Sequence, residues 1–230
     1  MNSQDKKIYI VIPAYNEEKV IQNVVAEIKD AGYENIIVVD DGSSDNTYEK
    51  AKEIKNITAL KHKINRGKGA AAKTGIEAAK TLKADIIVTM DGDGQHDPKD
   101  IENLTNPIIN KGFDTVLGSR LIDAKGMPYY KILHNKIANA VTWYLYGLWV
   151  TDSQSGFRAY SENAFNAINT KTDSYEYDSE VIREIYNHKL KYKEVPISVR
   201  YTEYSMGKSQ KQSFVNGLKT AYKMIWRVIG

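Results

Sequence analysis

Two aspartates on alternate positions, Asp91 and Asp93, follow directly after the apolar run Ile86–Met90. A run of this kind, rich in β-branched residues, is typical of a buried strand. Glycines flank both carboxylates and let the chain turn, so both side chains can reach one hard cation. Mg²⁺ and Mn²⁺ accept a few protein oxygens and complete their shells with phosphate oxygens. Asp-Gly-Asp alone also occurs in ordinary turns, but its place after a strand predicts a metal site.

Two further expected strands also end in polar clusters, Pro13–Glu17 and Asp40–Ser43. The carboxyl ends of parallel strands lie along one edge of a sheet, and ligands of such sheets bind there. Together with Asp91–Gln95, this edge would carry five carboxylates, which repel one another unless a cation or hydrogen-bond donors balance them. A helix cap or a turn is the alternative for Asp41 and Asp45. Three acidic strand ends on one edge nevertheless favour a binding site.

The elements that must position these clusters alternate between short apolar strands and amphipathic helices. In the first half, strands are expected at Ile8–Ile12, Ile36–Val39, Ile57–Lys61, Ile86–Met90 and Thr115–Leu117. Helices are expected at Lys19–Ala31, Asp45–Lys55, Gly69–Leu82 and from Pro98 onward. The second half adds helices at Tyr130–Trp149, Asp178–His188 and Phe214–Ile229 and strands at Phe157–Tyr160 and Val195–Tyr201. The alternation predicts an α/β fold, with a Rossmann-like, mostly parallel sheet flanked by helices.

Composition limits the class of protein. The 230 residues carry a net charge of +3, too small to argue for nucleic acid as a partner, and 42% are hydrophobic, enough for a substantial core. Cysteine is absent, which excludes disulfides and zinc–thiolate sites and fits a reducing compartment. The N-terminal segment lacks the apolar core of a signal peptide, and no stretch reaches the roughly 18 apolar residues of a membrane-spanning helix. We therefore expect a cytoplasmic protein.

Five segments, VIPAYNEE, VVDDGSSDNT, MDGDGQHDP, GSR and DSQSGFRAY, occur in the order seen in family 2 glycosyltransferases. The chain most resembles the branch that transfers mannose or glucose to dolichyl or polyprenyl phosphate, strongly from Ile8 to about Tyr160 and more loosely beyond. The resemblance implies a GT-A fold, inversion at the anomeric carbon, a UDP- or GDP-linked sugar donor and Mg²⁺ or Mn²⁺. We expect one GT-A domain at 1–212, with a nucleotide-sugar half at 1–120 and an acceptor half at 121–212, and a basic helix at 213–230.

The resemblance also implies roles for individual residues. Those that match the nucleotide-binding positions are Pro13, Ala14, Tyr15, Glu17, Asp40, Gly67, Lys68, Asp91, Gly92 and Asp93. Asp91, Asp93 and Gln95 match the metal positions. Gly67–Thr74 also comes close to a P-loop, but Ala72 stands where that loop needs a glycine to wrap the phosphates. A helix start is the better interpretation of that segment.

Two residues are candidates for catalysis, Arg120 of GSR and Asp152, which matches the position of the family's base. Candidates for holding an acceptor phosphate are Arg120, Lys131, Arg200 and Lys208. A phosphomonoester is already ionised near neutral pH, so such an acceptor needs positioning more than a general base. The alternatives are a turn role for Asp152 and solvated surface charges for Arg200 and Lys208. Lys131 stands where the branch often has arginine, so bidentate phosphate binding is lost there.

A lipid acceptor would require contact with a bilayer. The predicted helix Phe214–Ile229 places an apolar face beside Lys219, Lys223 and Arg227, which is the pattern of an interfacial helix. Further candidate interfacial aromatics are Trp143, Tyr146 and Trp149. Packing of both segments on the domain is the alternative. We expect peripheral attachment to the cytoplasmic face of a membrane and count a membrane-anchoring subunit among the candidate partners.

Other functions stay open from the sequence alone. A family 2 transferase can also use a glycan or another hydroxyl acceptor. A nucleotidyltransferase pairs a similar sheet with an acidic metal site, but it needs a basic, glycine-rich loop after the first strand, where this chain has PAYNEE. A non-catalytic sugar-nucleotide binder is disfavoured because Asp91, Asp93 and Gln95 are all present.

Overall fold

The central sheet of the computed structural model has seven strands within the residues that it describes, which are 6–123, 129–174 and 176–200. The strands are β1 (Ile8–Ala14), β2 (Ile36–Asp40), β3 (Thr58–Lys61), β4 (Ile86–Thr89), β5 (Thr115–Ser119), β6 (Arg158–Ser161) and β7 (Tyr192–Pro196). Their order across the sheet is β3-β2-β1-β4-β6-β5-β7. Four neighbouring pairs are parallel, so the prediction of a mostly parallel sheet is confirmed.

Strand β6 runs antiparallel to both of its neighbours, β4 and β5. It begins at Arg158, whose partners in the ladders are Thr89, the last residue of β4, and Leu117, in the middle of β5. Because β6 enters the sheet at the edge where β4 and β5 end, it must run back toward their beginnings. The residues just before β6 are thereby brought to the edge that carries the acidic clusters.

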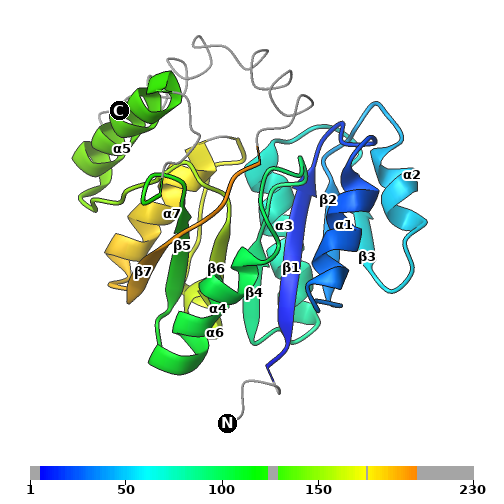
Figure 1. Ribbon diagram of the computed structural model, residues 1–230, viewed down its shortest axis with the longest axis horizontal. Helices are drawn as coiled ribbons and strands as arrows, with labels where there is room; N and C mark the ends of the chain where they lie inside the picture. Colours follow the sequence, from blue (N-terminus) through cyan, green and yellow to red (C-terminus); the bar gives the residue numbers. More distant parts are fainter. Residues whose placement is uncertain (1–5, 124–128, 175, 201–230) are drawn as a thin grey trace.

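Helices cover both faces of the sheet (Figure 1). They are α1 (Ile21–Asp30), α2 (Thr47–Lys52), α3 (Lys68–Thr81), α4 (Asp100–Lys111), α5 (Tyr129–Tyr146), α6 (Glu162–Ala167) and α7 (Glu176–Asn187). One core cluster joins α1, α2 and α4 to one face of the sheet, and a second joins α3, α6 and α7 to the other. In β1, Ile10 and Ile12 belong to the first cluster and Val11 to the second. The strand is continuously apolar because both of its faces are buried.

The ends of several elements follow from local chemistry. Helix α1 ends at Asp30, just before Gly32, whose φ of +91° favours glycine, as the sequence predicts. Gly147, with φ of +77°, follows the last residue of α5 and ends that helix before the predicted Trp149. The short helix α6 was not predicted; it begins after Ser161, whose side chain accepts a hydrogen bond from the backbone of Ala164.

The last strand is the main correction to the predicted elements. We expected it at Val195–Tyr201, whereas β7 spans Tyr192–Pro196. Strand β7 pairs with β5 from Thr115 to Ser119. Because β5 ends at Ser119, the residues after Pro196 have no further residue of β5 with which to pair. Beyond β7, the chain crosses to the acidic edge, where Val199 forms a bridge with His96.

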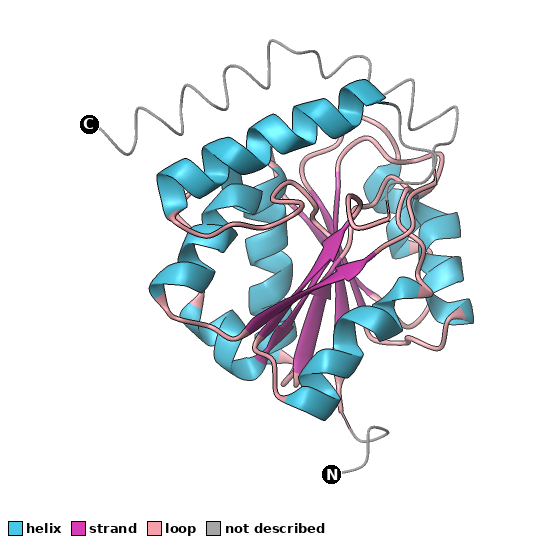
Figure 2. Ribbon diagram, turned by 60° about the vertical axis from the view of Figure 1, so that its left-hand side comes forward, coloured by secondary structure: helices cyan, strands magenta, loops and turns pink. Residues whose placement is uncertain are grey.

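Helix α5 lies across one end of the sheet (Figure 2). Its side chains Tyr129, Leu133, Ile137 and Tyr144 are all exposed, between 49% and 84%. Their spacing of four, four and seven residues places them on one face of the helix, which we call the α5 apolar stripe. None of the described helices is long and apolar enough to span a membrane.

Some predicted features lie outside the described residues. These are the domain boundary at residue 212 and the terminal helix within 213–230. The proposed division at residue 120 stays a prediction, although strands from both sides of it share one sheet.

Candidate active site

The three acidic strand ends meet at one edge, as the sequence predicts. The backbone N–H of Asp41, after β2, donates to the carbonyl oxygen of Ala14 at the end of β1, 2.8 Å away. Gly92, after β4, lies against the same strand, and a Cβ there would stand 3.2 Å from the carbonyl oxygen of Pro13 and 3.3 Å from the Cβ of Ala14. The predicted residues Pro13, Ala14 and Gly92 therefore line one contiguous edge.

Lys68 is the cation that balances this edge. Its ammonium Nζ lies 2.8 Å from Oδ1 of Asp91 and 3.1 Å from Oδ2 of Asp178 on α7. Burial opposes its charge, but the two carboxylates raise the pKa of Lys68 above its usual value, so it stays protonated. Burial alone would raise the pKa of Asp91, but the charges of Lys68, His96 and Arg120, with Lys68 contributing most, lower it to about 2. Asp91 is therefore the anionic partner of Lys68.

Within the described part of the chain, Asp93 has no ion pair like that of Asp91. Its partial burial and the charge of Asp91 both raise its pKa, opposed by His96 and by the backbone N–H of Gln95, which donates to Oδ1 at 3.0 Å. His96 is buried and stacks on Phe157 at 4.8 Å between ring centroids, and its Nδ1 has no hydrogen-bond partner among the residues that the structure describes. Asp91 and Asp93 therefore form a half-buried anionic pair that is only partly neutralised, and an added cation would stabilise it.

The donor set suits a metal held jointly by protein and substrate. Among the described residues, no group of three or more His, Asp or Glu side chains could hold a metal ion by itself. Mg²⁺ needs only one or two carboxylates where phosphate oxygens complete its octahedron. Asp91 and Asp93 meet that requirement, and the backbone of Gln95 is tied to Asp93 and, through its carbonyl oxygen, to the backbone N–H of Arg200 at 2.8 Å.

The predicted nucleotide residues on β1 and β2 differ in exposure. Tyr15 is 44% exposed, whereas Glu17 is buried and its backbone N–H donates to Oγ1 of Thr47 at 2.8 Å. Asp40 is fully buried and accepts hydrogen bonds from the backbone and the hydroxyl of Ser43. Its carboxylate also lies 3.9 Å from Nζ of Lys61. Contact of these residues with a base or ribose stays a prediction.

Asp41, for which we considered a turn or cap role, anchors the loop that leads to Gly67. Its carboxylate accepts hydrogen bonds from the backbone of Arg66 at 3.0 Å and of Gly67 at 2.7 Å, and it lies 2.7 Å from Nδ1 of His62. Gly67 has φ of +105°, and a Cβ there would stand 2.3 Å from the carbonyl oxygen of Asp173. Only glycine can adopt this positive φ and also fit the space next to Asp173.

Arg120 and Asp152, the two candidate catalytic residues, bind each other. Nε and Nη2 of Arg120 donate to the two carboxylate oxygens at 2.6 and 2.8 Å, and the backbone N–H of Arg120 donates at 3.0 Å. Burial would raise the pKa of Asp152, but the charge and the hydrogen bonds of Arg120 lower it. The charge of Arg120 also contributes to the low pKa of Asp91, so this pair belongs to the same site.

The remaining predicted cations are placed differently. Arg200 pairs with Glu27 at 2.6 Å and with Asp97 at 3.0 Å. Its guanidinium thereby links the segment after β7 to helix α1 and to the loop after β4. The structure does not bring it to Arg120, and its acceptor role stays a prediction. The side chain of Lys131 and the whole of Lys208 lie outside the described residues.

Three residues of this region escaped sequence reasoning, namely Asp178, Gly156 and Arg158. Arg158 is buried, and Nη2 donates to the carbonyl oxygen of Ser153 at 2.9 Å, which shapes the segment before β6. Burial opposes the charge of Arg158, but the neighbouring Tyr160 and Asp178 raise its pKa. The DSQSGFRAY motif contains Gly156 and Arg158, so the sequence offered a signal for these two residues. No motif in the sequence pointed to Asp178.

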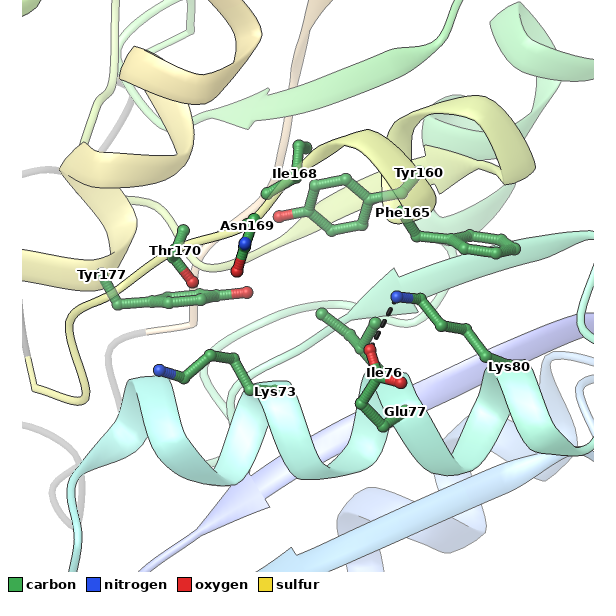
Figure 3. Close-up of a pocket in the computed structure, with 10 residues that line it drawn as sticks. All are labelled: Lys73, Ile76, Glu77, Lys80, Tyr160, Phe165, Ile168, Asn169, Thr170 and Tyr177. Atoms are coloured by element: carbon green, nitrogen blue, oxygen red, sulfur yellow. Dashed lines mark hydrogen bonds and ion pairs between the residues drawn. The ribbon is translucent and has the colours of Figure 1, made fainter. Parts of the chain in front are cut away.

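A separate cavity of about 150 Å³ lies on the face of the sheet that α3 and α7 cover (Figure 3). Lys73, Ile76 and Lys80 line it from α3, opposite Tyr160 and Tyr177. None of the predicted site residues lines this cavity.

Comparison with known proteins decides the family. The sequence model of glycosyl transferase family 2 matches residues 9–169, which include all of β1 but its first residue, β2 to β6 and all three acidic strand ends. The chain belongs to this family. It is therefore a glycosyltransferase, and the resemblance on which the residue roles rest is confirmed.

Characterised relatives share most of the length of this glycosyltransferase. It is 41% identical over 247 residues to the UDP-N-acetylglucosamine–dolichyl-phosphate N-acetylglucosaminyltransferase of Methanococcus voltae, covering 98% of both chains. It is 28% identical over 238 residues to the polyprenol monophosphomannose synthase of Mycolicibacterium smegmatis, covering 98% of this chain and 88% of that protein.

Solved structures support the fold. Glucosyl-3-phosphoglycerate synthase of Mycobacterium tuberculosis superposes with a TM-score of 0.71 at 20% identity, covering 96% of this chain and 79% of that one. The same enzyme crystallised with Mn²⁺, UDP and phosphoglyceric acid superposes with a TM-score of 0.66 at 18% identity, covering 95% and 79%. At this identity the likeness concerns the fold alone, which is the GT-A fold that the sequence predicts.

Proposed function

We propose that this glycosyltransferase moves a sugar from a nucleoside-diphosphate donor to a polyprenyl or dolichyl phosphate, with inversion and with a divalent metal. The observation that carries the proposal is the Arg120–Asp152 pair beside the acidic edge. Both carboxylate oxygens of Asp152 are occupied by Arg120, so Asp152 is poorly suited to take a proton. A phosphate acceptor is already an anion and needs no base, whereas a hydroxyl acceptor does.

The relatives support the acceptor class. The Methanococcus voltae enzyme is named for a dolichyl phosphate, and the Mycolicibacterium smegmatis enzyme for a polyprenol phosphate. These two names share an isoprenoid phosphate although their sugars differ. We extend that shared acceptor chemistry to this chain.

At the donor, the metal would neutralise the negative charge that develops on the departing diphosphate. Asp91 and Asp93 would hold it, since they form the half-buried, incompletely neutralised pair. Lys68 keeps a permanent positive charge beside Asp91 and can contact the diphosphate. Gly67 and its anchor Asp41 hold the loop that approaches the nucleotide. Mn²⁺ and UDP accompany the structural neighbour in its crystal, which favours the same ligand classes here.

For the donor sugar we propose UDP-N-acetylglucosamine as the first candidate. The sequence motifs suggested mannose or glucose, but the relative with 41% identity is named for N-acetylglucosamine. GDP-mannose remains the second candidate, because the 28% identical relative is named for mannose. A transfer assay with UDP- and GDP-linked donors decides between the two nucleotides.

The α5 apolar stripe is the surface that we propose for membrane contact. Four exposed apolar side chains share one face of a helix at one end of the sheet. Trp143 and Trp149 are half exposed and meet edge to face at 5.8 Å, whereas Tyr146 is buried and belongs to the domain. Peripheral attachment to the cytoplasmic face, aided by the predicted basic helix at 213–230 or by an anchoring subunit, would present Arg120 to a lipid phosphate.

The test is a transfer assay with a panel of donors. UDP-N-acetylglucosamine, UDP-glucose and GDP-mannose are each incubated with a short polyprenyl phosphate and Mg²⁺ or Mn²⁺, and the lipid product is identified by mass. The matched control is the same polyprenol without its phosphate. We expect transfer only to the phosphate; efficient transfer to the free polyprenol or to a glycan, with none to the phosphate, would favour the hydroxyl-acceptor alternative.

A further inference from the structure

Lys68 occupies an oxygen that the proposed metal site also needs. Its ammonium lies 2.8 Å from Oδ1 of Asp91, at the distance of a charge-assisted hydrogen bond. A metal ion and an ammonium both seek this oxygen, and their like charges repel each other when they approach it together. Lys68 and a divalent cation therefore compete for Asp91.

The contact between Lys68 and Asp91 is enclosed by backbone. A Cβ on Gly156 would stand 2.5 Å from Nζ of Lys68 and 2.8 Å from Oδ1 of Asp91, closer than real Cβ contacts allow. The carbonyl oxygen of Gly156 accepts a hydrogen bond from Oγ1 of Thr89 at 2.7 Å, which holds this backbone in place. Glycine at position 156 thus permits the ion pair, and any side chain there would press directly on it.

Asp178 provides a second carboxylate that binds the ammonium of Lys68. It is buried on α7, and its Oδ2 lies 3.1 Å from Nζ of Lys68. It comes from a helix on one face of the sheet, whereas Asp91 and Asp93 follow β4 at the edge. An ammonium that releases Asp91 therefore remains bound within the site through Asp178.

We infer that Lys68 is the resident counterion of Asp91 and makes metal binding depend on the nucleotide. Without nucleotide, the ammonium holds Asp91 and opposes the metal. The phosphate oxygens of a nucleoside diphosphate attract the ammonium, which releases Asp91 while Asp178 keeps Lys68 in reach. Asp178 and Gly156 are then positioning residues for this exchange. The inference rests on the metal-dependent function proposed above.

The experiment measures Mn²⁺ binding to the full chain by electron paramagnetic resonance, with and without UDP or GDP. We expect weak binding to the wild-type protein alone and much tighter binding with the nucleotide. Lys68→Met should raise the affinity for Mn²⁺ without nucleotide about tenfold, the equivalent of one charge-assisted contact, and should shrink the effect of the nucleotide. Lys73→Met is the matched control, because Lys73 lies on the same helix but pairs with Asp173 at 2.5 Å, and it should match the wild type.

Two variants of Asp178 test the exchange itself. Asp178→Asn removes one of the carboxylates that share the ammonium, so Lys68 should hold Asp91 more firmly. The affinity for Mn²⁺ without nucleotide should then fall severalfold, which is opposite in sign to Lys68→Met. The double variant Lys68→Met, Asp178→Asn should match Lys68→Met, because Asp178 acts only through Lys68. A purely structural role of Asp178 would lower the affinity in both backgrounds and would overturn the assignment.

The outcomes separate this inference from the proposed function. Unchanged or weaker Mn²⁺ binding in folded Lys68→Met, with binding still lost in Asp91→Asn, would overturn the counterion role and keep the metal site. Wild-type binding of Mn²⁺ and nucleotide by Asp91→Asn would instead remove the metal site itself. Should Lys68→Met not fold, as judged by its melting temperature, Lys68→Gln and the double variant Lys68→Gln, Asp178→Asn take its place, with the same expected results.

Discussion

The Arg120 guanidinium grips both carboxylate oxygens of Asp152, at 2.6 and 2.8 Å, while the Arg120 backbone N–H donates to one of them at 3.0 Å. Asp152 is buried, and its ion pair with Arg120 offsets the cost of burying its negative charge. The two residues therefore act as one unit, and their substitutions should have linked effects.

The first prediction concerns this unit in catalysis. Arg120→Ala should raise the KM for the acceptor, lower kcat, or both, by about tenfold to a hundredfold, because one charge-assisted contact to a phosphate is lost. Nucleotide affinity, measured by calorimetry, should change little. Asp152→Asn should cost less than the roughly 10²–10⁴ in rate that loss of a true general base would cause. A loss of that full size for Asp152→Asn would argue for a hydroxyl acceptor.

The second prediction is that Asp152 links stability to pH. Arg120 lowers its pKa in the folded protein below the value of the unfolded chain, despite burial. Its contribution to the free energy of unfolding is therefore fully present above the unfolded pKa of about 3.9 and is lost as the pH falls through and below that value. Urea unfolding between pH 7 and pH 3 should show a shallower dependence in Asp152→Asn than in the wild type. Equal slopes would mean that Asp152 has no shifted pKa.

The third prediction concerns the metal. Asp91→Asn and Asp93→Asn should each abolish transfer while the melting temperature stays near that of the wild type, because an amide keeps the shape and removes the anionic ligand. EDTA should inhibit the wild type, and Mg²⁺ or Mn²⁺ should restore it. Asp97→Asn is a suitable control, because Asp97 lies in the same loop but pairs with Arg200. Full activity of the Asp91→Asn, Asp93→Asn double variant would contradict the metal assignment.

The fourth prediction uses two glycines with positive φ. Gly67→Ala should lower the free energy of unfolding by about 2 kcal/mol or more and weaken nucleotide binding, since a Cβ would stand 2.3 Å from the carbonyl oxygen of Asp173. Gly112→Ala is the matched control, because φ is +60° there but nothing lies within 4 Å of the added Cβ. It should cost about 1 kcal/mol, through the backbone alone, and leave nucleotide binding unchanged. Equal costs would mean that the loop moves freely away from Asp173.

The fifth prediction concerns the membrane. Replacing Leu133, Ile137 and Tyr144 with Ser should weaken binding to anionic vesicles in co-sedimentation, because the α5 apolar stripe loses the area that it would bury. Leu82→Ser, at an exposed apolar position after α3, should bind as the wild type does. Charge reversal at Lys219, Lys223 and Arg227 should also weaken binding, by on the order of 1 kcal/mol for each residue. Wild-type co-sedimentation of all these variants would exclude both surfaces as anchors.

The sequence by itself determined the strands β1, β2 and β4 and the edge at which they end. Val11 and its neighbours in β1, and the similar runs in β2 and β4, are local signals, because continuous β-branched residues require burial on both faces. Once these strands are parallel, their polar ends must share an edge, so Asp40, Asp91 and Asp93 could be brought together in advance. The ordered family motifs added the identity of the chemistry.

Only the tertiary structure decided which charges pair. Lys68 meets Asp178 across 110 positions of the chain, and Arg120 meets Asp152 across 32. No local pattern encodes such pairs, because they depend on how α7 packs on α3 and on the reversal of β6, which returns the segment of Asp152 and Gly156 to the acidic edge. A periodic pattern specifies which face of an element is buried, whereas the partner of a buried charge is set by the few oxygens within about 3 Å after packing.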